Sequence, residues 1–293
     1  MLKIDGSFQA GALFMFHIRT MFRDDFGFAV RITKPLGWEL SEADFEFMIE
    51  LEPEGCFVLL EDSERIGLAT TISFSSIGWF GNLLILDNRR NRGAGSMLVE
   101  HSIKYLLGKG VKTVGLYAYK DRIHFYERLG FKRTSDFLIL KGKGVALPPS
   151  PYARETEKQD VQKIMEFDRS CFGADRRKLL EPILLDEDNV CFVSVQKGSL
   201  IGYAVAKLYG HKAEVGPFVC RERKGEVAVG LLASLLSRLE QRDVSMYVSS
   251  EDTSIISSLK KLGFSESSRV ARMFHGPQEF GTCLCMAESL ERG

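Results

Sequence analysis

Residues 90–96 have the composition of an anion-binding loop. They follow an apolar run, residues 82–87, and precede a helical pattern that starts at Met97. A helix N-terminus leaves backbone N–H groups unpaired, and its dipole favours negative charge. Gly93 and Gly95 let a phosphate approach the backbone closely. Arg90 and Arg92 add positive charge beside it. The segment therefore predicts a site for a phosphate-bearing ligand.

Two common phosphate loops do not fit this segment. A nucleoside-triphosphate loop needs Gly, four residues and then Gly-Lys-Ser/Thr, and the chain has no such string. A dinucleotide fingerprint needs a third glycine where Leu98 stands. A Gly-x-Gly before a helix is also an ordinary tight turn, so the segment alone leaves that alternative open.

A second string supports a ligand site. Residues 111–119 have the pattern of a strand, and a short helical stretch follows from Arg122. The stretch ends in Leu129-Gly130-Phe131, where Gly130 is predicted to be a left-handed cap.

The two strings together resemble the signature blocks of the GNAT acetyltransferase superfamily. Residues 90–95 match its pyrophosphate loop, Arg/Gln-x-x-Gly-x-Gly/Ala, and residues 126–131 match Tyr-x-x-x-Gly-Phe. The resemblance covers roughly residues 17–140 and implies a mixed sheet, splayed open between the strands at 82–87 and 111–119, with coenzyme A in the gap. Asn88 and Tyr119 depart from the pattern, since the family often has Pro and Asn at these positions.

The resemblance also implies roles for individual residues. Those expected to bind acetyl-coenzyme A are Leu83, Leu84, Ile85, Leu86, Arg90, Asn91, Arg92, Gly93, Ala94, Gly95, Ser96, Tyr119 and Tyr126. Tyr126 is the expected proton donor to the leaving thiolate, and a backbone N–H near Leu84 the expected donor to the carbonyl oxygen. The amine also needs a base, for which Glu54 or Asp175 acting through water are candidates. The expected acceptor-binding residues are Trp38, Asp175, Arg176 and Arg272. No metal site is expected.

The two halves of the chain repeat at an offset of 135 residues. Arg19 and Asp25 correspond to Arg154 and Asp160, and Cys-Phe-Val at 56–58 recurs at 191–193. A proline-rich stretch at 148–151 separates the halves and suits a stiff linker. The repeat predicts a catalytic domain over residues 1–147 and a second domain over 152–293, with hairpin turns at 61–64 and 196–199.

The second half has lost much of the chemistry. At the same offset, Gly225 replaces Arg90, Ala228 replaces Gly93, and Leu259 stands near the place of Tyr126. This half resembles the C-terminal domain of tandem GNAT proteins of the YitH type, through segments 216–219, 228–236, 262–264 and 272–276. One working cofactor site per chain is therefore expected, in the first half.

Composition narrows the class of protein. Lysine and arginine number 39 and so do the acidic residues, which argues against a general nucleic-acid binder. No apolar run has the length of a membrane span, and the run at 11–16 is too short for a signal-peptide core. The six cysteines form no Cys-x-x-Cys pair, which favours buried thiols in a reducing cytoplasm over metal ligands.

We therefore expect an α/β (α+β) protein with two tandem domains, each a splayed, mostly antiparallel sheet flanked by helices. The leading hypothesis is acetyl transfer from acetyl-coenzyme A to a primary amine of a small molecule, by direct attack in a ternary complex. A protein lysine or N-terminal acetyltransferase and a non-catalytic acyl-coenzyme A sensor are the alternatives. The sequence leaves monomer and homodimer open.

Overall fold

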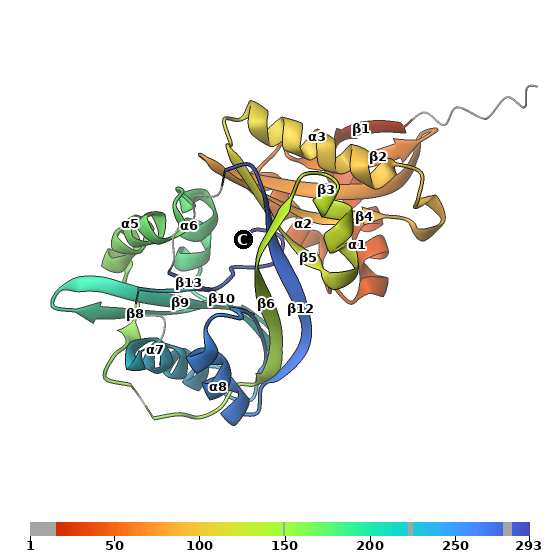
Figure 1. Ribbon diagram of the computed structural model, residues 1–293. Coiled ribbons are helices and arrows are strands. Elements are labelled where there is room, and N and C mark those ends of the chain that lie inside the picture. Colours follow the sequence, from red (N-terminus) through yellow and green to blue (C-terminus); the bar gives the residue numbers. More distant parts are fainter. Residues whose placement is uncertain (1–15, 149, 222–224, 278–282) are drawn as a thin grey trace, which may run out of the picture.

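The computed structural model describes residues 16–148, 150–221, 225–277 and 283–293 (Figure 1). In the first half the elements are β1 (Phe16–Thr20), α1 (Phe26–Thr33), α2 (Glu42–Leu51), β2 (Cys56–Glu61), β3 (Glu64–Phe74), β4 (Ile77–Ile85), α3 (Ala94–Gly108), β5 (Thr113–Tyr119), α4 (Ile123–Glu127) and β6 (Lys132–Lys143). In the second half they are β7 (Arg154–Glu155), α5 (Val161–Phe172), α6 (Arg177–Leu185), β8 (Val190–Gln196), β9 (Ser199–Tyr209), β10 (Lys212–Cys220), α7 (Glu226–Ser237), β11 (Asp243–Ser249), α8 (Thr253–Lys261), β12 (Ser265–His275) and β13 (Leu284–Met286).

The internal repeat is present in three dimensions. Up to β6 and β12, both halves run strand, two helices, three strands, helix, strand, helix, strand. The paired Arg and Asp of the repeat form the same ion pair in each half, at 2.7 Å for Arg19–Asp25 and 2.6 Å for Arg154–Asp160. Both predicted hairpins are confirmed, because β2 pairs with β3 and β8 with β9 around the expected turns.

The halves exchange strands. Among the described residues one mixed sheet runs β1-β2-β3-β4-β5-β12-β6-β11-β13-β10-β9-β8-β7. β12, from the end of the chain, lies between β5 and β6 of the first half. β6 in turn pairs with β11 of the second half. Figure 1 shows these two long strands crossing the centre of the molecule.

Since each half takes a strand from the other, the cores are continuous. One hydrophobic cluster contains Trp79 and Phe137 of the first half together with Tyr203 and Phe274 of the second. The division into domains at 147 and 152 stays a prediction, and Pro149 of the linker and residues 11–15 of the apolar run lie outside the described residues.

Arg176 lies at the centre of the second half, where it has a structural role. Its guanidinium is fully buried and makes two hydrogen bonds to Asp168, of 2.7 and 3.1 Å, and one of 2.8 Å to the Gly293 carbonyl. It also lies 3.9 Å from the centroid of the Phe172 ring. The prediction that Arg176 binds the acceptor is wrong, because its donors are already used inside the protein.

Replacing Arg176 tests this structural role. Arg176→Met should lower the free energy of unfolding by about 3–5 kcal/mol, because it leaves the Asp168 carboxylate buried without its partner. Urea denaturation measures the change. The matched control is Arg177→Met, at the exposed neighbouring position, with an expected change within about 0.5 kcal/mol. Equal losses in the two variants would contradict the assigned role.

Candidate functional site

The first half opens between β4 and β5. The two parallel strands pair only from Ile77 to Trp79, opposite Thr113 to Gly115, and then separate. Past this point β4 has a bulge opposite β3, where Asn82 adopts a φ of 50°. The predicted opening is therefore present, and we call the point of separation the fork. β4 begins at Ile77, five residues before the predicted run, and ends at Ile85.

The loop after β4 leads directly into α3. Gly93 stands at the N-cap with a φ of 83°, in the left-handed region, and no side chain caps the helix. The first intrahelical bond runs from the Met97 N–H to the Gly93 carbonyl, so the N–H groups of residues 94–96 have no partner within the helix. The last three residues of the predicted loop thus form the first helical turn. Such a turn has N–H groups available to an anion, and we call it the cradle.

Arginines around the cradle are held by carboxylates. Arg92 lies 2.6 Å and Arg89 2.8 Å from the carboxylate of Glu61, whose side chain is only 2% exposed. Arg90 donates to the Ile85 carbonyl at 3.1 Å and pairs with Asp87 at 2.7 Å. Glu61 could not be identified from the sequence, because nothing about a hairpin-turn residue indicates that its side chain reaches the loop at 90–96. Its carboxylate fixes the Arg92 guanidinium at the end of β2.

Tyr126 is buried beneath the cradle side of the sheet. Its ring packs against Phe80, Phe125 and Phe131, with centroids 6.4, 5.0 and 5.8 Å away. Burial raises the pKa of the Tyr126 phenol well above its ordinary value, while Arg122 opposes this weakly. The hydroxyl therefore keeps its proton at neutral pH, as a hydrogen-bond donor must.

The backbone N–H expected near Leu84 is not that of Leu84 itself. Leu84 pairs with Leu68, and the Leu86 N–H donates to Ile66, which places both N–H groups on the β3 side of β4. By the alternation of a strand, Ile85 directs its backbone groups to the open side. The Ile85 carbonyl indeed accepts from Arg90, so the better donor is the Ile85 N–H.

The two predicted bases, Glu54 and Asp175, each have a partner within the protein, and their role as bases stays a prediction. The Glu54 side chain is 72% exposed and pairs with Lys109 at 2.9 Å, just beyond the last residue of α3. That point is about 20 Å from the cradle, because α3 has 15 residues. The Asp175 carboxylate accepts a hydrogen bond from the Arg177 N–H at 2.9 Å, at the start of α6.

Three other predicted residues lie on β5 or beside it. Tyr119 ends β5, and Trp38 donates a hydrogen bond to its hydroxyl. Arg272 of β12 stands opposite Tyr117 of β5, with its guanidinium 5.1 Å from the Phe137 ring centroid. Tyr119 thus belongs to the face opposite Tyr126, since successive strand residues alternate and Ala118 packs with Tyr126.

The corresponding opening in the second half is filled by the chain itself. β10 and β11 pair from Lys212 to Val215 and then separate, as β4 and β5 do. Here β13 enters the gap, paired with β10 on one side and β11 on the other. At the start of α7, Tyr152 donates to Glu226 at 2.7 Å, so the linker lies over the position of the cradle. The second half is degenerate in shape as well as in sequence.

Among the described residues, no group of three or more His, Cys, Asp or Glu side chains could hold a metal ion. The six cysteines are free thiols. No helix in the described part of the chain is long and apolar enough to cross a membrane.

Comparisons with known proteins match both halves. The acetyltransferase (GNAT) family matches residues 17–131, and an acetyltransferase (GNAT) domain matches residues 164–282. The holothin acyltransferase of Pseudoalteromonas sp. (strain SANK 73390) is 22% identical, over 83% of this chain and 82% of that protein. The uncharacterized N-acetyltransferase YitH of Bacillus subtilis (strain 168) is 25% identical, over 72% and 73%.

Solved structures share the whole fold. A putative acetyltransferase from Pyrococcus horikoshii superposes with a TM-score of 0.80 at 18% identity, covering 95% of this chain and 96% of the other. A tandem GNAT protein from the clavulanic acid biosynthesis pathway gives a TM-score of 0.62 at 14% identity, covering 90% and 100%.

Gly93 offers a direct test of the cradle. Gly93→Ala should weaken binding of coenzyme A about tenfold, because a left-handed φ costs a residue with a Cβ about 1–2 kcal/mol. Isothermal titration calorimetry measures the affinity. Gly108→Ala, in the last turn of the same helix, is the control: Gly108 has no left-handed φ and no atom within 4 Å of an added Cβ. If both variants bind as the unmodified chain does, the cradle is not the binding site.

Proposed function

We propose that the first half of this chain transfers the acetyl group of acetyl-coenzyme A to a primary amine of a small molecule. The premise is that the chain consists of two GNAT acetyltransferase domains in tandem and so is an acyl-coenzyme A-dependent acyltransferase. The observation that carries the proposal is the fork, which opens directly beside the uncapped start of α3. A ligand with a pyrophosphate and a long amide-bearing arm fits such a pair of features.

The residues present fit coenzyme A. The unpaired N–H groups of residues 94–96, with Arg90 and Arg92 beside them, suit the pyrophosphate. The edge of β4 beyond the fork offers backbone groups to the amides of the pantetheine arm. When bound, acetyl-coenzyme A supplies the acetyl thioester. Every other part of the reaction falls to the protein.

Three tasks remain for the chain. The amine nitrogen must bond to the thioester carbon as the carbon–sulfur bond breaks, and we assign the Ile85 N–H as the donor to the carbonyl oxygen as it gains charge. We assign Tyr126 as the donor to the departing sulfur. Since burial raises the pKa of Tyr126 above that of a thiol, a hydrogen bond that stabilises the thiolate is favoured over complete proton transfer. The amine must also lose a proton.

Ion pairs between the halves favour a small acceptor over a protein segment, because they tie the two halves together. Lys212 of β10 pairs with Glu39 at 2.6 Å, and Lys178 of α6 pairs with Glu52 at 2.5 Å. Glu39 is next to Trp38, so the first pair ties the loop before α2 to the second half. The relative from Pseudoalteromonas is named a holothin acyltransferase, and we take its named acceptor as support for this choice.

Replacing Tyr126 separates chemistry from binding. Tyr126→Phe should lower the rate of free-thiol release about 100-fold, because the departing sulfur loses its hydrogen bond, while the affinity for coenzyme A stays unchanged. The assay follows acetyl-coenzyme A with tyramine, spermidine, glucosamine and lysine. Tyr209→Phe, at an exposed tyrosine of β9, is the control. Unchanged turnover in Tyr126→Phe would remove the tyrosine from the mechanism.

The filled gap of the second half predicts the stoichiometry. Coenzyme A should bind once per chain, because β13 and Tyr152 occupy the equivalent positions of the second half. Calorimetric titration of the complete chain gives the number of sites. A value near two would refute the assignment of a single site.

A further inference from the structure

The final segment of the chain, residues 287–293, lies at the fork of the first half. The Leu290 carbonyl accepts a hydrogen bond of 3.3 Å from the Trp79 indole, and Trp79 is the last residue of β4 that pairs with β5. Gly81, two residues further, is in such close contact with Glu291 that an added Cβ would lie 2.7 Å from the Glu291 Cα. Figure 1 shows the end of the chain in the centre, between the halves.

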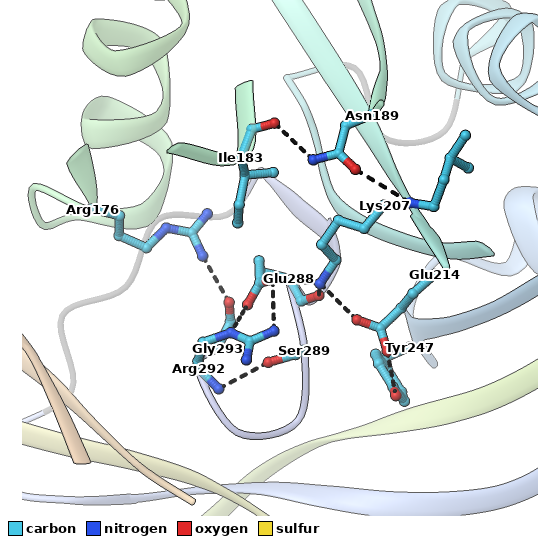
Figure 2. Close-up of polar contacts among 11 residues, drawn as sticks. Arg176, Ile183, Asn189, Lys207, Glu214, Tyr247, Glu288, Ser289, Arg292 and Gly293 are labelled. Atoms are coloured by element: carbon cyan, nitrogen blue, oxygen red, sulfur yellow. Dashed lines mark hydrogen bonds and ion pairs between the residues drawn. The ribbon is translucent and has the colours of Figure 1, made fainter. Parts of the chain in front are cut away.

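A buried network holds this segment in place (Figure 2). Glu288, fully buried, pairs with Lys207 of β9 and with Arg292, whose Nε lies 2.9 Å away. Lys207 also forms an ion pair with Glu214 at 2.6 Å, and Arg176 donates a hydrogen bond to the Gly293 carbonyl. Burial raises the pKa of Glu288, but Arg292 and Lys207 outweigh this and lower it to about 2. Glu288 is therefore ionised at any ordinary pH.

Glu291 has different surroundings from Glu288. Its neighbour Arg292 pairs with Glu288, while the Glu291 carboxylate accepts a hydrogen bond from Ser289. It lies close enough to Tyr119 of β5 and to Tyr247 of β11 to raise the pKa of both phenols. The facing charged groups are Glu214 of β10 and Arg292. Burial raises the pKa of Glu291, and Glu214 adds to this against the opposing effect of Arg292.

β4 itself has no Asp or Glu and carries Asn82 at the bulge. Of the two predicted bases, Glu54 pairs with Lys109, and Asp175 of the second half accepts from the Arg177 N–H. One polar atom at the bulge has no partner: the Asn82 Oδ1 is buried without a hydrogen bond, although its Nδ2 donates to Thr70 at 3.1 Å. An acceptor amine at the fork would meet this oxygen and the Glu291 carboxylate.

We propose that Glu291, carried by the final segment of the second half, binds the acceptor amine and takes its proton in the reaction of the first half. The proposal rests on the proposed function. The amine binds as an ammonium ion, gives one proton to the Glu291 carboxylate, and attacks with the freed lone pair. The new C–N bond replaces the C–S bond, and the nitrogen releases its second proton to water. The thiolate takes a proton from water, and Glu291 returns its proton to water before the next turnover. A carboxylate with a raised pKa is a stronger base for this transfer.

The experiment replaces the carboxylate without changing its size. Glu291→Gln in the complete chain should lower amine-dependent thiol release about 100-fold, with the panel amine that the unmodified chain acetylates fastest among tyramine, spermidine, glucosamine and lysine. Affinity for coenzyme A, measured by calorimetry, should stay within twofold. In the unmodified chain kcat/KM should fall at low pH as Glu291 becomes protonated, and the variant should lose this acidic limb.

The control is Glu187→Gln, at an exposed carboxylate of the second half, with unchanged rates and pH profile expected. Glu291→Asp, which keeps the charge, should recover part of the lost rate. The proposal is overturned if Glu291→Gln turns over the amine at the original rate with the original pH profile. It is also overturned, together with the proposed function, if the unmodified chain binds coenzyme A and acetylates no amine.

Discussion

The exchange of β6 and β12 is the constraint on which the rest of the structure depends. β5 pairs with β4 over only three residues. The backbone N–H and C=O groups on its other edge therefore need hydrogen-bond partners along the strand. β12 does this from Val270 to His275, and β6 does the same for β11 from Phe137 to Lys143. The strands of each half are fully paired only with a strand from the other half. The separation of β4 from β5 is therefore tolerated, because the other half provides strand pairing for β5.

Strand exchange also explains how two copies of one fold could diverge. β12 pairs with β5 of the first half, whereas β13, the next strand in the chain, pairs with β10 of the second half. There it fills the gap between β10 and β11 with backbone hydrogen bonds, a place that a pantetheine arm would otherwise need. The second half thereby gives up a ligand site and gains a fixed final segment. Its Gly225 and Glu226, which lack the charge of Arg90, agree with this change.

The part of the site that could be predicted is the part formed by neighbouring residues. Gly93 and Gly130 have the left-handed φ values, 83° and 86°, that a turn before a helix and a cap after one require. The repeat predicted the hairpins because these are also local. Which N–H near Leu84 faces the opening could not be predicted, because N–H direction depends on register with β3, and the register depends on a bulge. Glu61 and Glu291 were missed because only the folded chain brings them to the loop and to the fork.

Fixing the final segment requires the burial of charged side chains, which is unfavourable in free energy, and the arrangement of these charges indicates what the burial achieves. Lys207, Glu288 and Arg292 are each at most 6% exposed, and removing such groups from water is unfavourable unless every one is paired. Apolar side chains of similar volume would hold two packed surfaces together at least as well. Ion pairs with hydrogen-bond geometry add direction: Lys207 binds the Glu288 side chain and its carbonyl at 2.8 Å, while Arg292 binds the same carboxylate from the other side. With Glu288 and Arg292 so oriented, Glu291 between them is held against Gly81 at the fork. A network that sets orientation is better suited to presenting a functional group there than to adding stability.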